Sequence, residues 1–188
     1  ISAFARSREH LLEICDVVLR LLAVSVAHSV ILSKMTFCDS ALINATSLEY
    51  LMEQCQSLIC LSLHNLDINE NHCRLLGTYS RSDLQIELER CRFIDAAAET
   101  LAGVLGRNQG PTKLVYCEID NFVLASGLRG NSRLQSLTPC DSTNREDSNR
   151  GALAIASALR ENKGLFHLKL GRGDGFMISD EASDAVCD

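Results

Sequence analysis

Aliphatic residues recur along this chain in two alternating patterns. In one, leucines follow the form L-x-x-L-x-L-x-x-[N/C]-x-[I/L/F], in which apolar positions alternate with polar ones. The clearest copy consists of Leu58, Leu61, Leu63, Leu66 and Ile68. Alternation with a period of two is typical of a strand with one buried face. In the other pattern, as in residues 96–105 and 150–159, apolar residues lie three and four apart, which predicts helices.

The strand pattern returns at near-constant intervals. We expect strands to centre near residues 61–63, 86–88, 114, 135–137 and 168–170. Equivalent positions after these strands are residues 66, 91, 117, 142 and 173, which gives steps of 25, 26, 25 and 31. A repeat of roughly 20 to 50 residues is typical of stacked strand-helix units that share one core.

The longest of these steps contains a polar insertion. Residues 140–149 read Cys-Asp-Ser-Thr-Asn-Arg-Glu-Asp-Ser-Asn, which is rich in turn-forming residues. We expect an exposed loop there, followed by a helix that begins near Arg150. Thr112, Pro139 and the short helix around residues 75–77 also depart from the pattern, so we expect irregular units at these places.

A recurring Asn or Cys completes the repeated unit. Cys91 and Cys117 come just after two of the predicted strands. An Asn at this position could hydrogen-bond buried backbone groups through its amide, and a Cys could do so weakly through its S–H. A second set lies at the helix ends and consists of Cys55, Asn108, Asn131 and Asn162.

These spacings resemble the leucine-rich repeat family. The L-x-x-L-x-L strand and the L-A-x-x-L-x-x-N helix are similar to its ribonuclease-inhibitor-like group, Cys91-Arg-Phe-Ile-Asp95 is similar to its cysteine-containing group, and residues 106–114 resemble a diatom repeat family. The resemblance covers residues 30–188. It implies an α/β fold, a leucine-rich repeat solenoid in a right-handed arc, with a parallel sheet on the concave side and helices on the convex side. It does not specify a function, because the fold supports many.

We expect residues 1–188 to form a single leucine-rich repeat array. We also expect this array to be a segment of a longer solenoid. Residues 1–29 read as an N-terminal helix or cap, and the uncharged stretch that begins in them, from Leu21 to Ser33, is too short to span a membrane. A net charge of −6 argues against binding to nucleic acid or to an anionic membrane.

No catalytic or metal-binding constellation stands out. The nine cysteines form no C-x-x-C pair, which disfavours both a zinc site and a disulfide framework and indicates reduced thiols in the cytoplasm. His64, His72 and Cys73 could form a Cys/His pair or a metal cluster, but a surface histidine is the simpler interpretation of His64. We expect no enzyme activity and no cofactor.

We therefore expect the chain to bind another protein through strand residues that point away from the core. These are Ser62, His64, Asn65, Gln85, Glu87, Glu89, Arg90, Lys113, Val115, Tyr116, Ser136, Thr138, His167, Lys169 and Arg172. They combine an acidic second strand with Lys113 and with Tyr116, an aromatic residue of the kind that anchors interfaces. Two alternatives remain: a regulator of a small GTPase, which would need an exposed Arg or Asn at a strand end, and an enzyme of the doubly wound α/β type.

Overall fold

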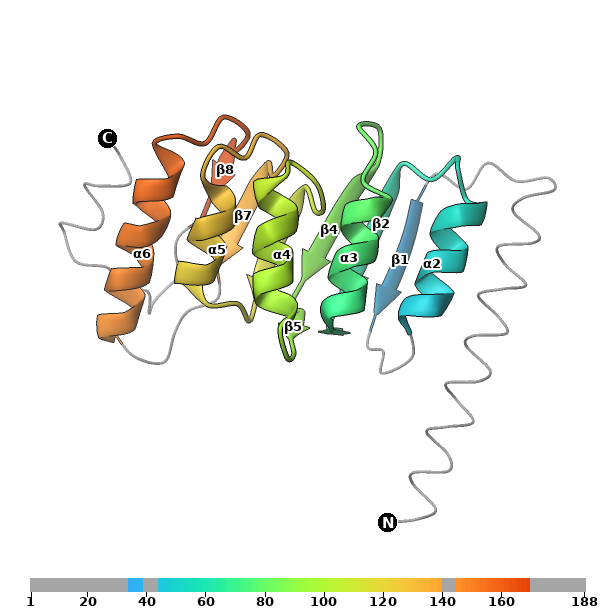
Figure 1. The fold of residues 1–188 in the computed structure, drawn as a ribbon, viewed down its shortest axis with the longest axis horizontal. Helices are drawn as coiled ribbons and strands as arrows, with labels where there is room; N and C mark the ends of the chain where they lie inside the picture. The colour runs from blue at the N-terminus through green and yellow to red at the C-terminus, as the bar shows by residue number, and fades with distance from the viewer. Residues whose placement is uncertain (1–33, 39–43, 140–144, 170–188) are drawn as a thin grey trace, which may run out of the picture.

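The computed structural model describes residues 34–38, 44–139 and 145–169 of the chain, and these residues form an α/β fold. Their main element is a six-stranded parallel sheet in the order β1-β2-β4-β6-β7-β8 (Figure 1). Its strands are β1 (Lys34–Cys38), β2 (Cys60–His64), β4 (Gln85–Glu89), β6 (Lys113–Cys117), β7 (Ser136–Pro139) and β8 (His167–Leu168). A second, two-stranded parallel sheet consists of β3 (Asp67–Ile68) and β5 (Arg92–Phe93).

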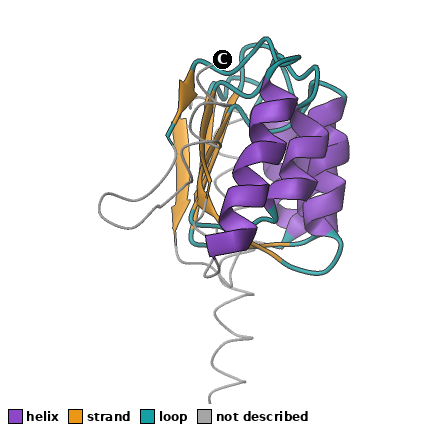
Figure 2. Cartoon of the chain, turned by 90° about the vertical axis from the view of Figure 1, so that its left-hand side faces the viewer, coloured by secondary structure: helices purple, strands orange, loops and turns teal. Residues whose placement is uncertain are grey.

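Five helices of the described residues lie side by side on one face of the sheet (Figure 2). They are α2 (Ala45–Gln54), α3 (Glu70–Thr78), α4 (Ala97–Gly106), α5 (Asn121–Leu128) and α6 (Arg145–Leu159). A doubly wound enzyme fold would place helices on both faces of the sheet. The described helices do not have that arrangement, so these residues do not form a doubly wound sheet.

Each strand is bordered by the strand one unit further along the sequence. The pairs Cys60–Gln85 and Glu87–Lys113 reproduce the predicted steps of 25 and 26. The next step was predicted as 25 but is 23, from Lys113 to Ser136. The reason lies in the connecting helix, because α5 has 8 residues where α4 has 10.

The long last step is 31 residues, as predicted, but its surplus is not all loop. Helix α6 begins at Arg145 and has 15 residues, so the prediction of a loop up to residue 149 is wrong. Arg and Glu are good helix formers, and the Ser and Asn residues around them conceal this tendency in the sequence. Residues 140–144 lie outside the described residues, as do residues 1–29 and Arg172.

The places expected to be irregular fit the sheet through local compensation. Thr112 replaces an aliphatic residue, and its hydroxyl accepts from the Ile86 N–H at 3.1 Å and donates to the Ile86 carbonyl at 3.0 Å. Pro139 does not break the strand but ends it, paired with Cys117. The unit around residues 75–77 contains α3, an ordinary helix whose N-cap Asn69 accepts from the His72 N–H.

The core lies between the sheet and the helix layer. The inward positions of the strands are fully buried aliphatic residues, namely Leu61, Leu63, Ile86, Leu88, Leu114 and Leu137. Helices approach one another closely where residues are small: a Cβ added to Gly127 of α5 would lie 2.5 Å from the Ala102 carbonyl oxygen of α4. Burial of these aliphatic side chains is the main source of stability in such a fold.

The recurring Cys and Asn side chains make equivalent bonds from unit to unit. The Cys91 thiol donates to the Leu63 carbonyl and the Cys117 thiol to the Leu88 carbonyl, each at 3.4 Å, which are bonds of the predicted kind between S–H and buried backbone groups. At the helix ends, the Asn162 Nδ2 donates to the Leu128 carbonyl at 2.8 Å. These bonds satisfy buried backbone groups that would otherwise lack partners.

Candidate functional site

The face of the sheet opposite the helices, called the open face below, presents aligned rows of side chains. The alignment follows from the parallel register, which places equivalent residues of neighbouring strands next to one another. The first row consists of Thr36, Ser62, Glu87, Lys113, Ser136 and His167. The second consists of His64, Glu89, Val115, Thr138 and Lys169, and Gln85 lies beside Cys60 before the first.

Glu87 is the centre of a polar group in the first row. Its carboxylate accepts a hydrogen bond from the Ser62 hydroxyl at 3.1 Å and lies 3.8 Å from the Lys113 ammonium. The short Ser62 side chain is consequently buried, with 1% of its surface exposed. Three strands, β2, β4 and β6, are linked through this one carboxylate.

Glu89 occupies the equivalent position in the second row, but its basic neighbours come from β2 and from the end of its own strand. The His64 Nδ1 lies 3.7 Å from one of its oxygens, and the Arg90 Nε lies 3.9 Å from the other. The strand that the sequence identifies as acidic therefore has each of its carboxylates next to a basic group. Its charge is largely compensated within the face.

Three of the predicted site residues are at strand ends in the left-handed backbone region. Asn65, Arg90 and Tyr116 have φ values of 55°, 53° and 51°. The N–H of Asn65 donates to the Glu89 carbonyl and that of Arg90 to the Val115 carbonyl. Glycine and Asn adopt this conformation readily, while it costs other residues roughly 1–2 kcal/mol, so the residue types at Arg90 and Tyr116 did not indicate it.

The β8 end of the open face is different in charge. His167 and Lys169 are exposed, and neither has an ion pair among the described residues. Thr138, predicted as a binding residue, has only 7% of its surface exposed. It is a short side chain with neighbouring strands on both sides, which explains why it is less accessible than its register position suggested.

The structure does not bring His64, His72 and Cys73 together as one chemical site. His72 forms a capping box with Asn69 at the start of α3, and the Cys73 thiol donates to the Ala97 carbonyl at 3.3 Å. Burial, with the nearby Glu70 carboxylate, raises the pKa of Cys73 to about 12, so the thiol stays protonated and unreactive. Within the described residues, no group of three or more metal-ligating side chains is placed to hold an ion.

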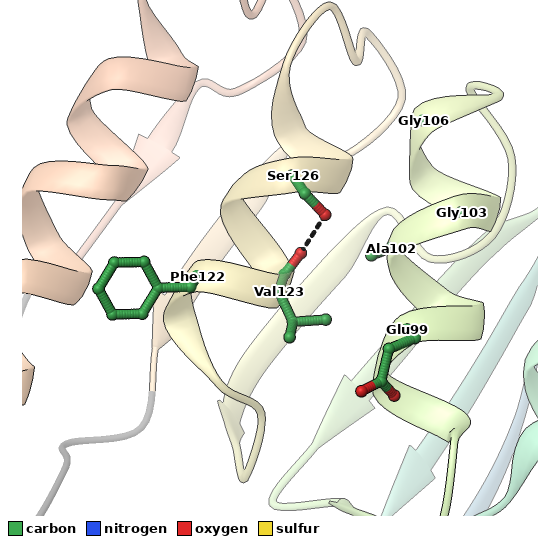
Figure 3. Close-up of a pocket in the computed structure, with 7 residues that line it drawn as sticks. All are labelled: Glu99, Ala102, Gly103, Gly106, Phe122, Val123 and Ser126. Atoms are coloured by element: carbon green, nitrogen blue, oxygen red, sulfur yellow. Dashed lines mark hydrogen bonds between the residues drawn. The ribbon is translucent and has the colours of Figure 1, made fainter.

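A groove on the helix layer was not predicted (Figure 3). It has a volume of about 520 Å³ and lies between α4 and α5, on the side away from the open face. Its lining consists of Glu99, Ala102, Gly103, Gly106, Phe122, Val123 and Ser126. The Ser126 hydroxyl donates to the Val123 carbonyl at 2.7 Å. Glu99 is the one charged residue in the lining. Ala102, Gly103 and Gly106 of α4 are the sequence feature that could have indicated the groove. Small residues at these positions are equally typical of closely packed helices.

The helix layer also has exposed apolar side chains. Phe122 is 45% exposed, and the Arg150 guanidinium lies 5.6 Å from the centre of its ring. None of the helices among the described residues has both the length and the apolar character needed to cross a membrane.

Comparison with known proteins gives little support for a family. No protein-family model matches the chain, and no curated protein matches it. Among solved structures, the C-terminal domain of tropomodulin from Caenorhabditis elegans is similar, with 17% sequence identity and a TM-score of 0.42 over 94% of this chain and 89% of that one. A likeness at this level assigns neither a family nor a function.

Proposed function

We propose that this chain is a leucine-rich repeat solenoid of the ribonuclease-inhibitor-like type, and that its open face binds another protein. The main supporting observation is the layering: all described helices lie on one face of a six-stranded parallel sheet. Parallel sheets usually have both faces covered. A face that the described helices leave uncovered, and that is lined with aligned polar rows, is the surface that such a repeat architecture uses for binding.

The repeated bonds support the solenoid part of the proposal. Asn131 donates to the Leu105 carbonyl and Asn162 to the Leu128 carbonyl, so the same side chain joins each unit to the one before it. The two thiols of Cys91 and Cys117 repeat in the same way after the strands. Since these thiols act as hydrogen-bond donors, reduced cysteines and a cytoplasmic location fit the proposal.

The open face is preorganised for recognition. Glu87 accepts a hydrogen bond from Ser62 and lies within ion-pair distance of Lys113, and Glu89 lies next to Arg90 and His64. Held side chains lose less rotamer freedom on binding than mobile ones. A partner would therefore meet side chains that already have neighbours within the face.

A capture experiment with paired variants tests the proposal. The native chain, the double variant Glu87→Lys/Tyr116→Ala and the control Glu161→Lys would each be immobilised, and retained proteins compared by quantitative mass spectrometry. Glu161 is 62% exposed and pairs with Arg129 away from the open face, so its reversal matches the charge change without touching the proposed site. Proteins retained by the native chain and the control, and lost by the double variant, are expected. Equal retention by all three chains would refute the open face as the binding surface.

A further inference from the structure

Two buried thiols of neighbouring units lie side by side in the core. Cys91 follows β4 and Cys117 ends β6, and the Glu118 N–H donates to the Cys91 carbonyl at 2.9 Å. Arg92 and Glu118, the residues directly after the two cysteines, pair as parallel neighbours. Adjacent parallel strands are about 4.8 Å apart, which is within the Cα separation of about 4.4–6.8 Å that a disulfide requires.

The two side chains also have the same orientation. The Cys91 thiol donates to the Leu63 carbonyl and the Cys117 thiol to the Leu88 carbonyl, so each points toward the preceding unit. Each sulfur lies 3.6 Å from the carbonyl oxygen two residues before it. The Cys117 thiol also hydrogen-bonds to the Cys91 sulfur. Side chains that point apart could not be bridged, and these two do not point apart.

The hydrogen bond between the sulfurs distinguishes this pair from other buried thiols of the described residues. It lowers the pKa of Cys91 below its ordinary value, although burial acts in the opposite direction. Burial raises the pKa of Cys55, at the end of α2, and of Cys73 on α3. Since the thiolate is the form that oxidants attack, Cys91 is more readily oxidised than Cys55 or Cys73 once an oxidant reaches it.

An oxidant can reach the pair through the strand ends. Cys91 and Cys117 are 0% and 2% exposed, so the chain must open locally before either thiol reacts. The residues directly before them, Arg90 and Tyr116, have φ values of 53° and 51°, and opening there releases a strained backbone. The pairing of β6 with β7 is also irregular between Val115 and Cys117. Local opening therefore costs less here than in the middle of the strands.

We propose that Cys91 and Cys117 form a disulfide when a peroxide oxidises the chain, which links two adjacent units. The Cys91 thiolate attacks one peroxide oxygen, the O–O bond breaks, and the leaving hydroxide takes up a proton to become water. Cys91 is then a sulfenic acid. The Cys117 thiol loses its proton, and its sulfur attacks the Cys91 sulfur and displaces hydroxide, which is protonated to a second water. Two thiols are oxidised to one disulfide while hydrogen peroxide is reduced to two waters. This inference does not depend on the proposed binding function.

Mass spectrometry of the whole chain tests the proposal. The reduced chain would be treated with hydrogen peroxide in native buffer, its remaining thiols alkylated in urea, and the chain digested without reductant. We expect a peptide pair joined through Cys91 and Cys117 that disappears on reduction. Alkylation should be lost at these two cysteines together, while Cys55 and Cys73 stay alkylated. Peroxide treatment in concentrated urea is the control for the fold and should not favour this pair.

Two serine variants test the route. Cys117→Ser keeps a hydrogen-bond donor for the Leu88 carbonyl but removes the second sulfur, so the sulfenic acid at Cys91 should persist and be labelled by dimedone. The control Cys73→Ser should form the same cross-link as the native chain. Cross-links that join Cys91 or Cys117 mainly to other cysteines or to a second chain would overturn the proposal. Equal loss of alkylation at Cys73, the same pairing in urea, or no dimedone labelling of Cys117→Ser would overturn it too.

Discussion

The side chain of Asn131 donates a hydrogen bond to the carbonyl of Leu105, 26 residues earlier in the chain. Its Oδ1 accepts from the N–H groups of Arg133 and Leu134, at 3.0 and 2.8 Å, so one buried amide joins the end of α5 to the end of α4 and to the segment before β7. Asn162 repeats the arrangement one unit later with Leu128. Neighbouring units are thus connected by side chains as well as by the sheet.

Loss of this connection should be costly. Asn131→Ala leaves one carbonyl and two N–H groups without their partner in a buried place, and we expect a loss of about 2–4 kcal/mol in the free energy of unfolding. Urea unfolding would measure it. Asn108→Gly is the control, because Asn108 is exposed, bonds to the exposed Ser132, and has a φ of 58° that glycine also adopts without strain. A loss no larger than that of the control would show that the buried amide is dispensable.

Leu88 and Glu87 are neighbours on β4, and we expect substitution of the first to lower stability and substitution of the second to impair partner binding. Leu88 is fully buried, so Leu88→Ala should cost about 2–5 kcal/mol of stability. Glu87→Lys/Tyr116→Ala should cost no more than about 1 kcal/mol and should abolish partner binding, because Glu87 lies on the open face. Thermal melts and binding assays on both variants separate the effects. Equal destabilisation would mean that the two faces of the strand are assigned the wrong way round.

The close contact between α4 and α5 can be tested with two glycines. An alanine Cβ at Gly127 would lie 2.5 Å from the Ala102 carbonyl oxygen, so Gly127→Ala should push the helices apart and cost about 1–3 kcal/mol. At Gly106 the same added Cβ meets nothing within 4 Å. Gly106→Ala should therefore be neutral or stabilising by up to about 1 kcal/mol. If both variants melt like the native chain, the helix contact is looser than described.

A pH dependence follows from Cys73. Burial, reinforced by Glu70, raises the pKa of its thiol from an ordinary value of 9.0 to about 12. A raised pKa in the folded chain means that the stability from this group is complete below pH 9 and is lost as pH rises towards 12. Cys73→Ala should reduce the fall in stability over that window, as measured by urea unfolding on either side of pH 9. Identical slopes for the variant and the native chain would contradict the assignment.

The main features of the fold could be predicted where the spacing of aliphatic residues is compatible with only one type of secondary structure. Aliphatic residues at alternate positions of β2 and β4 indicated strands, and the fixed step between them indicated their pairing. Strand β1 was missed because it has no leucine, although Met35 pairs with Leu61 in the same register. The start of α6 was missed because Ser and Asn, which favour turns in isolation, are also compatible with the first turns of a helix.

The candidate site was harder to predict than the fold. Alternation placed Glu87 and Lys113 on the open face, but only the register shows that they lie 3.8 Å apart and neutralise one another. The burial of Thr138 depends on neighbouring strands that are distant in sequence. Pairing between units decides these properties, and a pattern read along one unit contains no information about it.

The most direct test of the proposed binding surface is carboxyl footprinting of the complex. Carbodiimide-driven labelling, read by mass spectrometry, would compare the free chain with the chain bound to a captured partner. We expect labelling of Glu87 and Glu89 to fall on binding, while Glu99 and Glu161, which lie away from the open face, keep their free levels. Protection of Glu99 with unchanged labelling of Glu87 and Glu89 would place the partner on the helix layer and contradict the proposal.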